Sequence, residues 1–63
     1  MNTASIENAA RNLQKDYAIA HDLDANQDDI TAAKGRIEMR TTYLNAKGFQ
    51  VFADEHDVML MAA

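Results

Sequence analysis

Cysteine and proline are missing from this chain, and glycine occurs only twice. Without cysteine, the protein can form neither a disulfide nor a thiolate metal site. No apolar run approaches the roughly 20 residues that a membrane-spanning helix needs. The N-terminus also lacks the basic start and apolar stretch of a signal peptide. These absences predict a cytoplasmic protein with no membrane partner.

The chain is short and has few large apolar side chains. Of its 63 residues, 30 are apolar, but 12 of those are alanine, which leaves 18 larger side chains to build a core. A domain of this length buries only about 60% of the surface that its unfolded chain exposes. Small scaffolds usually need a disulfide, a metal or a partner to become stable. We therefore expect one small domain over residues 1–63 that associates with itself, as a homodimer or a higher oligomer.

Charge is unevenly distributed along the chain, whose net charge is −4. Residues 22–29 carry four aspartates and no base, and residues 48–63 carry three acids and no base. Because phosphate contact needs clustered lysine and arginine, nucleic acid is a disfavoured partner. The candidate contacts for it are the four cations of residues 30–47, namely Lys34, Arg36, Arg40 and Lys47.

Apolar residues near the N-terminus recur at spacings of three and four, which places them on one face of a helix. They are Ile6, Ala9, Ala10, Leu13, Tyr17 and Ala20. Asn2, Thr3 and Ser5 are candidate N-caps, because their side-chain oxygens can accept a first-turn N–H. The pattern predicts a helix over about residues 3–24.

The aspartate-rich segment 22–29 interrupts this pattern, because aspartate and asparagine favour caps and turns. Its D-x-D-x-N spacing is also how a calcium-binding loop begins. In such a loop, however, Gln27 would occupy the position that needs glycine, Asp29 the apolar position, and Ala33 the position of the bidentate glutamate. We interpret the segment as a capped turn between two helices, with no metal site.

A second helix is predicted over about residues 28–47, with apolar side chains on two faces. One stripe can pack on the first helix in an antiparallel hairpin; it contains Ile30, Ala33, Ile37 and Leu44. The other stripe lies roughly opposite and contains Ala32, Gly35, Met39, Tyr43 and Ala46. Glycine costs about 1 kcal/mol against alanine inside a helix, so close packing of another backbone is a plausible reason for Gly35. The cover of this second stripe is either the chain's own C-terminal segment or a subunit interface.

Gly48 marks the end of the second helix, because glycine readily takes the left-handed conformation that follows a helix. Two apolar runs then flank the polar residues 54–57, a pattern typical of a β-hairpin with strands at about residues 49–53 and 58–62. The resulting fold class is α+β, mainly α. An all-α fold with a short third helix from Asp54 is the alternative. Since both faces of the hairpin are apolar, we expect Val58 and Leu60 to join the interface with another chain.

The sequence offers little chemistry. His21 and His56 each lie beside an aspartate, but a catalytic histidine also needs a nucleophile, and neither glycine has the context of a phosphate-binding loop. We predict no catalytic residues, no metal site, no cofactor and no enzymatic activity. The leading hypothesis is a regulatory protein that acts by binding itself and a further protein, since methionine surfaces adapt to partners. The alternative is a nucleic-acid-binding accessory protein that uses the basic flank of the second helix.

The opening run from Met1 to Arg11 (MNTASIENAAR) and the length of 63 residues resemble the accessory proteins encoded between the exonuclease and excisionase genes of lambdoid bacteriophages. The resemblance spans the whole chain but includes no diagnostic motif and carries over no functional residue. It implies an early phage protein of the host cytoplasm, with a host protein as a possible partner. Such a protein would bias lytic against lysogenic development or perturb the host cell cycle.

Overall fold

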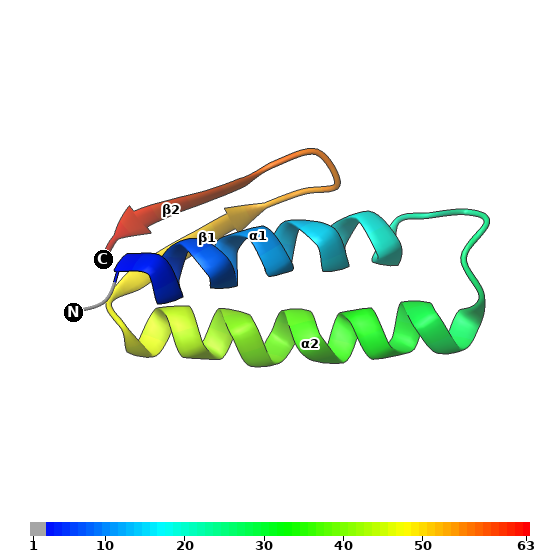
Figure 1. Cartoon of the computed structure of the whole chain (residues 1–63), viewed down its shortest axis with the longest axis horizontal. Helices are drawn as coiled ribbons and strands as arrows, with labels where there is room; N and C mark the ends of the chain where they lie inside the picture. The colour runs from blue at the N-terminus through cyan, green and yellow to red at the C-terminus, as the bar shows by residue number, and fades with distance from the viewer. Residues whose placement is uncertain (1–2) are drawn as a thin grey trace.

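The computed structural model of the chain describes residues 3–63, which form two helices followed by a two-stranded hairpin (Figure 1). Helix α1 spans Thr3–Ala20, helix α2 Gln27–Ala46, strand β1 Phe49–Ala53 and strand β2 Val58–Ala62. The predicted class, α+β and mainly α, is confirmed, and the strands have the predicted bounds. The alternative with a third helix from Asp54 is wrong, because that residue begins the hairpin turn.

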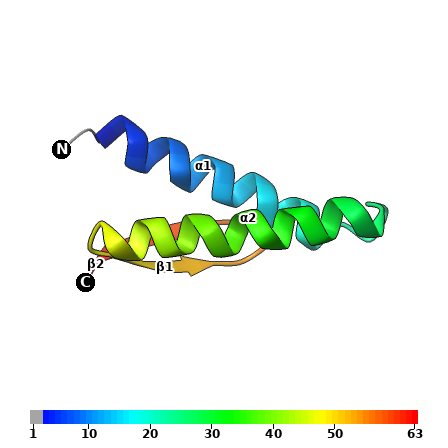
Figure 2. The ribbon, with the colours of Figure 1, turned by 90° about the horizontal axis from the view of Figure 1, so that it is seen from below.

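The two helices run antiparallel, and the hairpin packs across them on one side (Figures 1 and 2). Strand β1 contacts α2 and strand β2 contacts α1, so the hairpin bridges the pair. The N-terminal end of α1 leans away from α2 (Figure 2). The molecule is elongated, with extents of 37 × 18 × 18 Å, and the long axis follows the helices.

Helix α1 ends at Ala20, four residues earlier than predicted. The reason is local competition for backbone hydrogen bonds, which short polar side chains supply. The Asp22 carboxylate accepts a bond from the Asp24 N–H at 2.9 Å, and the Asp22 N–H donates to the Ile19 carbonyl at 3.1 Å. At the other end of α1, the candidate cap Asn2 lies outside the described residues.

Helix α2 begins one residue before the predicted start, and Asn26 is its N-cap. The Asn26 side-chain oxygen accepts a bond from the Asp29 N–H at 2.9 Å. Asp28 and Asp29 occupy the first turn, where their charge faces the positive end of the helix dipole. The acidic segment therefore forms the capped interhelical turn that the sequence predicted.

Gly48 ends α2 with a φ of 92°, the left-handed conformation predicted for it. Its N–H donates to the Asn45 carbonyl at 3.1 Å, which satisfies one of the carbonyls left open at the end of a helix. Phe49 follows and packs against the core cluster that contains Leu44. This turn sends the chain back along α2 as β1.

The core lies where α1, α2 and the inner face of the hairpin meet. Leu13, Leu44 and Ala33 are fully buried, and Ile6 is 9% exposed. The partly buried residues around this centre come from all four elements: Ala9, Tyr17, Ile37, Phe49, Val51, Val58 and Leu60. Much apolar surface therefore stays outside the core, and its position defines the candidate site.

Candidate interaction surfaces

The second apolar stripe of α2, which we call the α2 stripe, is exposed at all five of its residues: Ala32, Gly35, Met39, Tyr43 and Ala46. Met39 is 74% exposed and Tyr43 is 40% exposed. The hairpin contacts α2 elsewhere, so the alternative in which the chain's own C-terminal segment covers this stripe is wrong. Within residues 3–63, the stripe is left open to solvent.

Gly35 belongs to the α2 stripe and has open space around it. A Cβ atom built on this residue would meet no atom within 4 Å, so packing inside the chain does not require glycine here. At the C-terminal end of the stripe, the Lys47 ammonium lies 5.6 Å from the centre of the Tyr43 ring. This distance is within the range of a cation–π contact and places a positive charge over that end of the stripe.

The hairpin has one buried and one exposed apolar face, because side chains alternate along a strand. Val58 and Leu60, predicted at the interface, pack instead against the core cluster. They are partly buried there, whereas the outward residues of β2 are Met59 and Met61, which are 57% and 52% exposed. Phe52 lies across from Met59 in the strand pair and is 50% exposed.

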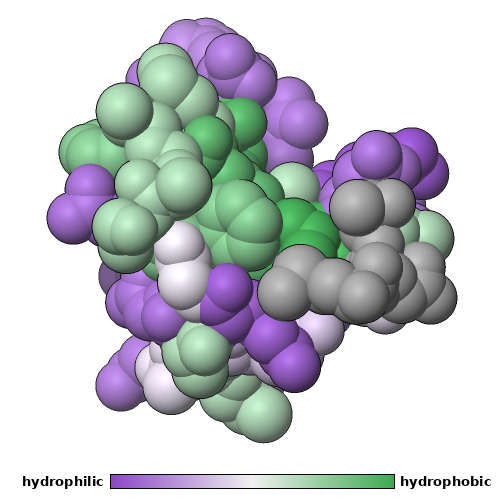
Figure 3. Space-filling model, turned by 90° about the vertical axis from the view of Figure 1, so that its left-hand side faces the viewer, coloured by the Kyte–Doolittle hydropathy of each residue, from purple (hydrophilic) through white to green (hydrophobic). Residues whose placement is uncertain are grey.

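Phe52, Met59 and Met61 together form what we call the outer hairpin face. Viewed from the end of the molecule that carries the C-terminus, hydrophobic surface gathers over the hairpin (Figure 3). An open groove of about 450 Å³ runs beside this face between α2 and β1. Its lining residues are Thr41, Asn45, Phe49, Gln50, Val51, Phe52 and Ala63. The outer hairpin face is thus continuous with a depression that side chains of a partner could enter.

The hairpin turn is ordered by its own aspartates. Asp54 Oδ1 accepts hydrogen bonds from the N–H groups of His56 and Asp57, at 2.8 and 2.9 Å. These two bonds hold the pKa of Asp54 below its ordinary value of 3.8, because they stabilise the ionised carboxylate. The Asp57 carboxylate in turn accepts the Val58 N–H at 2.9 Å, so the turn passes directly into β2.

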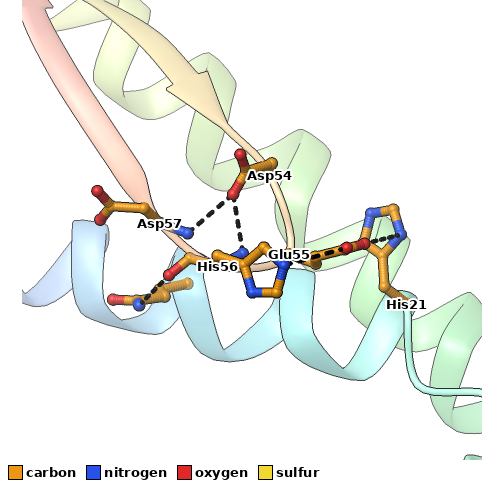
Figure 4. Close-up of polar contacts among 6 residues, drawn as sticks. His21, Asp54, Glu55, His56 and Asp57 are labelled. Carbon is orange, nitrogen blue, oxygen red and sulfur yellow. Dashed lines mark hydrogen bonds and ion pairs between the residues drawn. The ribbon is translucent and has the colours of Figure 1, made fainter.

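The same turn is attached to α1 (Figure 4). Gln14 Nε2 donates to the His56 carbonyl at 3.1 Å, and Glu55 Oε2 lies 3.4 Å from Nδ1 of His21. The other Glu55 oxygen is 3.3 Å from Nε2 of His56, so both histidines flank one carboxylate. These contacts fix the hairpin on the helices and present its outer face in one orientation.

The two histidines do not lie in a recognisable catalytic arrangement. Both are exposed, and the carboxylate between them is 50% exposed, whereas a catalytic base is usually held in a cleft. Among residues 3–63, no cluster of three or more histidine and carboxylate side chains is arranged to hold a metal ion. The chemistry available at this point is a surface ion pair that forms when either histidine is protonated.

Two of the four predicted nucleic-acid contacts, Arg36 and Arg40, are paired with a buried carboxylate. Asp16, which is 5% exposed, accepts from Arg36 Nε at 3.0 Å and pairs with Arg36 Nη2 at 2.9 Å. Arg40 Nη1 pairs with the second Asp16 oxygen. Sequence reasoning missed this site, although Asp16 lies three residues after the core residue Leu13 and therefore borders the apolar face of α1. Lys34 of α2 and Lys47, the residue after α2, are exposed but are 13 positions apart in the sequence.

Comparison of the chain with protein-family models, with curated proteins and with solved structures gives no match. Across the described part of the chain, neither helix combines the length and the apolar content that a membrane span needs.

Proposed function

We propose that this protein acts by binding another protein through its outer hairpin face, without enzymatic activity or a cofactor. The observation that carries the proposal is the exposure of three large apolar side chains, Phe52, Met59 and Met61, at 50%, 57% and 52%. Exposed apolar clusters of this kind mark interaction sites more often than isolated apolar residues do. Phenylalanine and methionine are also among the side chains that supply contact area at interfaces.

The backbone of the hairpin supports the same proposal. The sheet described here has two strands, so each strand has one edge without a β partner. Charged side chains and proline usually protect the edge of a sheet from pairing with another strand. Strand β2, with the sequence VMLMA, contains neither. An extended segment of a partner can pair with such an edge while its side chains contact the adjacent face. We therefore propose an extended segment with alternating apolar side chains as the bound element.

The attachment of the turn to α1 favours tight binding by this face. The packing of Val51, Val58 and Leu60 on the core and the Gln14 bond to the His56 carbonyl order the hairpin within the single chain. A surface that is already ordered loses less conformational entropy when it binds. This is why we assign binding to the hairpin and not to the interhelical turn, where Leu23 is exposed alone.

For the biological role, we propose an early regulatory protein of a lambdoid phage that works in the host cytoplasm. The resemblance of residues 1–11 and of the length to such proteins motivates this role. In it, the outer hairpin face would bind a host protein and so bias lytic against lysogenic development or perturb the host cell cycle. Nucleic-acid binding is the weaker alternative, because Arg36 and Arg40 both pair with Asp16, whose carboxylate offsets one of their two positive charges.

The test replaces Met59 and Met61 together by threonine. Threonine suits a strand, and both side chains point away from the core, so the hairpin should persist. The matched control is Leu23→Gln, which removes an exposed apolar side chain from the interhelical turn. A host protein captured by the immobilised wild-type chain is purified, and its affinity for all three chains is measured by calorimetry.

The proposal expects the partner to bind the wild-type chain and the Leu23→Gln variant equally, and to bind the threonine variant at least about tenfold more weakly. Circular dichroism should show the same helix content in all three chains. Equal binding by the threonine variant would reject the outer hairpin face as the binding site. The effect of each chain on lysogeny is then measured in infected cells. If a variant that no longer binds the partner still has the wild-type effect, binding by the outer hairpin face is not the cause of that effect.

A further inference from the structure

We infer that the α2 stripe binds the same stripe of a second copy of this chain, with the two α2 helices antiparallel. The stripe has successive spacings of three, four, four and three residues, and so it is symmetric about Met39. A two-fold interface uses one patch on both subunits, and the patch has to complement itself. A stripe that has the same spacing in both chain directions meets this condition for antiparallel helices.

The sizes of the side chains favour the same arrangement. Aligning two stripes antiparallel about Met39 places Gly35 of one copy opposite Tyr43 of the other, and Ala32 opposite Ala46. The open space around Gly35 can then accept the ring of Tyr43, which is 40% exposed. A parallel alignment would instead place the two tyrosines against each other and the two glycines across a gap, which loses packing contacts.

Charge is complementary only in the antiparallel direction. The N-terminal turn of α2 carries Asp28 and Asp29, and its C-terminal end carries Lys47, whose ammonium lies over Tyr43 on the stripe side. Antiparallel packing brings the aspartates of one copy near the lysine of the other, and opposite charges across an interface favour that orientation. Parallel packing would bring like charges together at both ends.

This surface is distinct from the outer hairpin face. The α2 stripe consists of residues of one helix, whereas the outer hairpin face consists of residues of β1 and β2. Substitutions can therefore disrupt self-association and partner binding separately. The occupant we assign to the stripe is a second copy of the chain, because the symmetry, the size pairing and the charge pairing are all properties of the stripe against itself.

Cysteine crosslinking tests the orientation cleanly, because the natural chain has no cysteine. Two variants are made, Ala32→Cys and Ala46→Cys, each a small change at an exposed position. The two positions are 14 residues apart, or about 21 Å along the helix. In an antiparallel pair of identical variants, the two cysteines are therefore about 21 Å apart. In a mixed pair, Cys at position 32 of one chain faces Cys at position 46 of the other. An added thiol oxidant, which is reduced as two thiols become one disulfide, reports the pairing.

The inference expects a disulfide-linked dimer when the two variants are mixed, and little when either is oxidised alone. The control Lys34→Cys, on another side of α2, should remain at background. Efficient crosslinking of either variant with itself would overturn the antiparallel arrangement. Absence of crosslinking in the mixture would overturn the interface.

A second variant tests the interface without thiol chemistry. Gly35→Gln fits the open space of the single chain and favours the helix, so folding should be unimpaired, whereas the added side chain blocks Tyr43 of the second copy. Sedimentation equilibrium should show the dimerisation constant weakened at least about tenfold, and unchanged in the control Glu38→Gln. A wild-type chain that stays monomeric, or a Gly35→Gln variant that associates like wild type, would overturn the inference.

Discussion

Replacement of Asp16 by asparagine should destabilise the fold strongly, although it changes the shape of the side chain very little. Asp16 is 5% exposed and binds two arginines of α2, with Arg36 at 2.9 and 3.0 Å. Asparagine keeps one acceptor oxygen but loses the negative charge. The change therefore isolates the electrostatic part of the contact between α1 and α2.

The magnitude follows from the exposure of the three side chains. A hydrogen bond to a charged group contributes about 1.5–3 kcal/mol, and Asp16 makes such bonds to both arginines. Arg36 is 44% exposed and Arg40 29%, so water screens the pairs and rehydrates the arginines once the charge is gone. We therefore expect a loss of about 2 kcal/mol, below the cost of breaking a fully buried pair, which is about 3–5 kcal/mol.

Such a loss is large for this chain, because a domain of this length has a free energy of unfolding of about 3–9 kcal/mol. Urea denaturation followed by circular dichroism should show the loss as a lower midpoint with an unchanged slope. The melting temperature should fall by about 8–16 °C. Glu38→Gln is the charge-matched control, since Glu38 is exposed, and it should change stability by less than about 0.5 kcal/mol. If Asp16→Asn behaves like this control, the ion pair does not stabilise the fold and the reasoning fails.

Two pairs of substitutions and one titration test the fold further. Gly48→Ala should cost about 1–2 kcal/mol of stability because of the positive φ at this position. Gly35→Ala should instead stabilise the monomer by up to about 1 kcal/mol. Thermal melts at low protein concentration in which both variants shift the melting temperature in the same direction would contradict this. Leu44→Ala should cost about 2–5 kcal/mol, since Leu44 is fully buried, whereas Leu23→Ala at a fully exposed site should cost almost nothing; equal urea midpoints would reject the described core. The lowered pKa of Asp54 means that its carboxylate stabilises the turn above its unfolded pKa of about 3.8. That stabilisation is lost as the pH falls through the lower folded value, and NMR titration of the two amides bound by Asp54 should give a midpoint below 3.8; a midpoint at or above that value would disagree.

The hairpin was predictable in its bounds because its signals are local. A glycine in the left-handed conformation precedes β1, and a four-residue polar turn separates two apolar runs. The end of α1 was predicted less well. Apolar residues continue through Leu23, whereas the helix ends before Asp22, whose side chain accepts the Asp24 N–H. Side chains and helix compete here for backbone N–H groups, and the spacing of apolar residues does not report the outcome.

The candidate surfaces were predictable in part for a related reason. The α2 stripe follows from helical spacing. Its residues are exposed in the single chain, as the alternative of a subunit interface requires. The face of the hairpin that points inward could not be predicted, because both faces carry large apolar side chains and a strand pattern with two apolar faces has no preferred side. For that reason, Val58 and Leu60 were placed at an interface, although they complete the core.

The described methionines of this chain lie outside its buried centre. The buried centre is built from branched side chains and alanine, and branched residues specify a core because they have few rotamers. Met39, Met59 and Met61 all lie outside and are at least half exposed. Methionine is flexible and polarizable, so it fits irregular partner surfaces better than it defines a core. The stability of the monomer should therefore be insensitive to polar replacements at these three positions, and the effect of such replacements should appear in binding instead: Met39 in self-association, and Met59 and Met61 in partner capture.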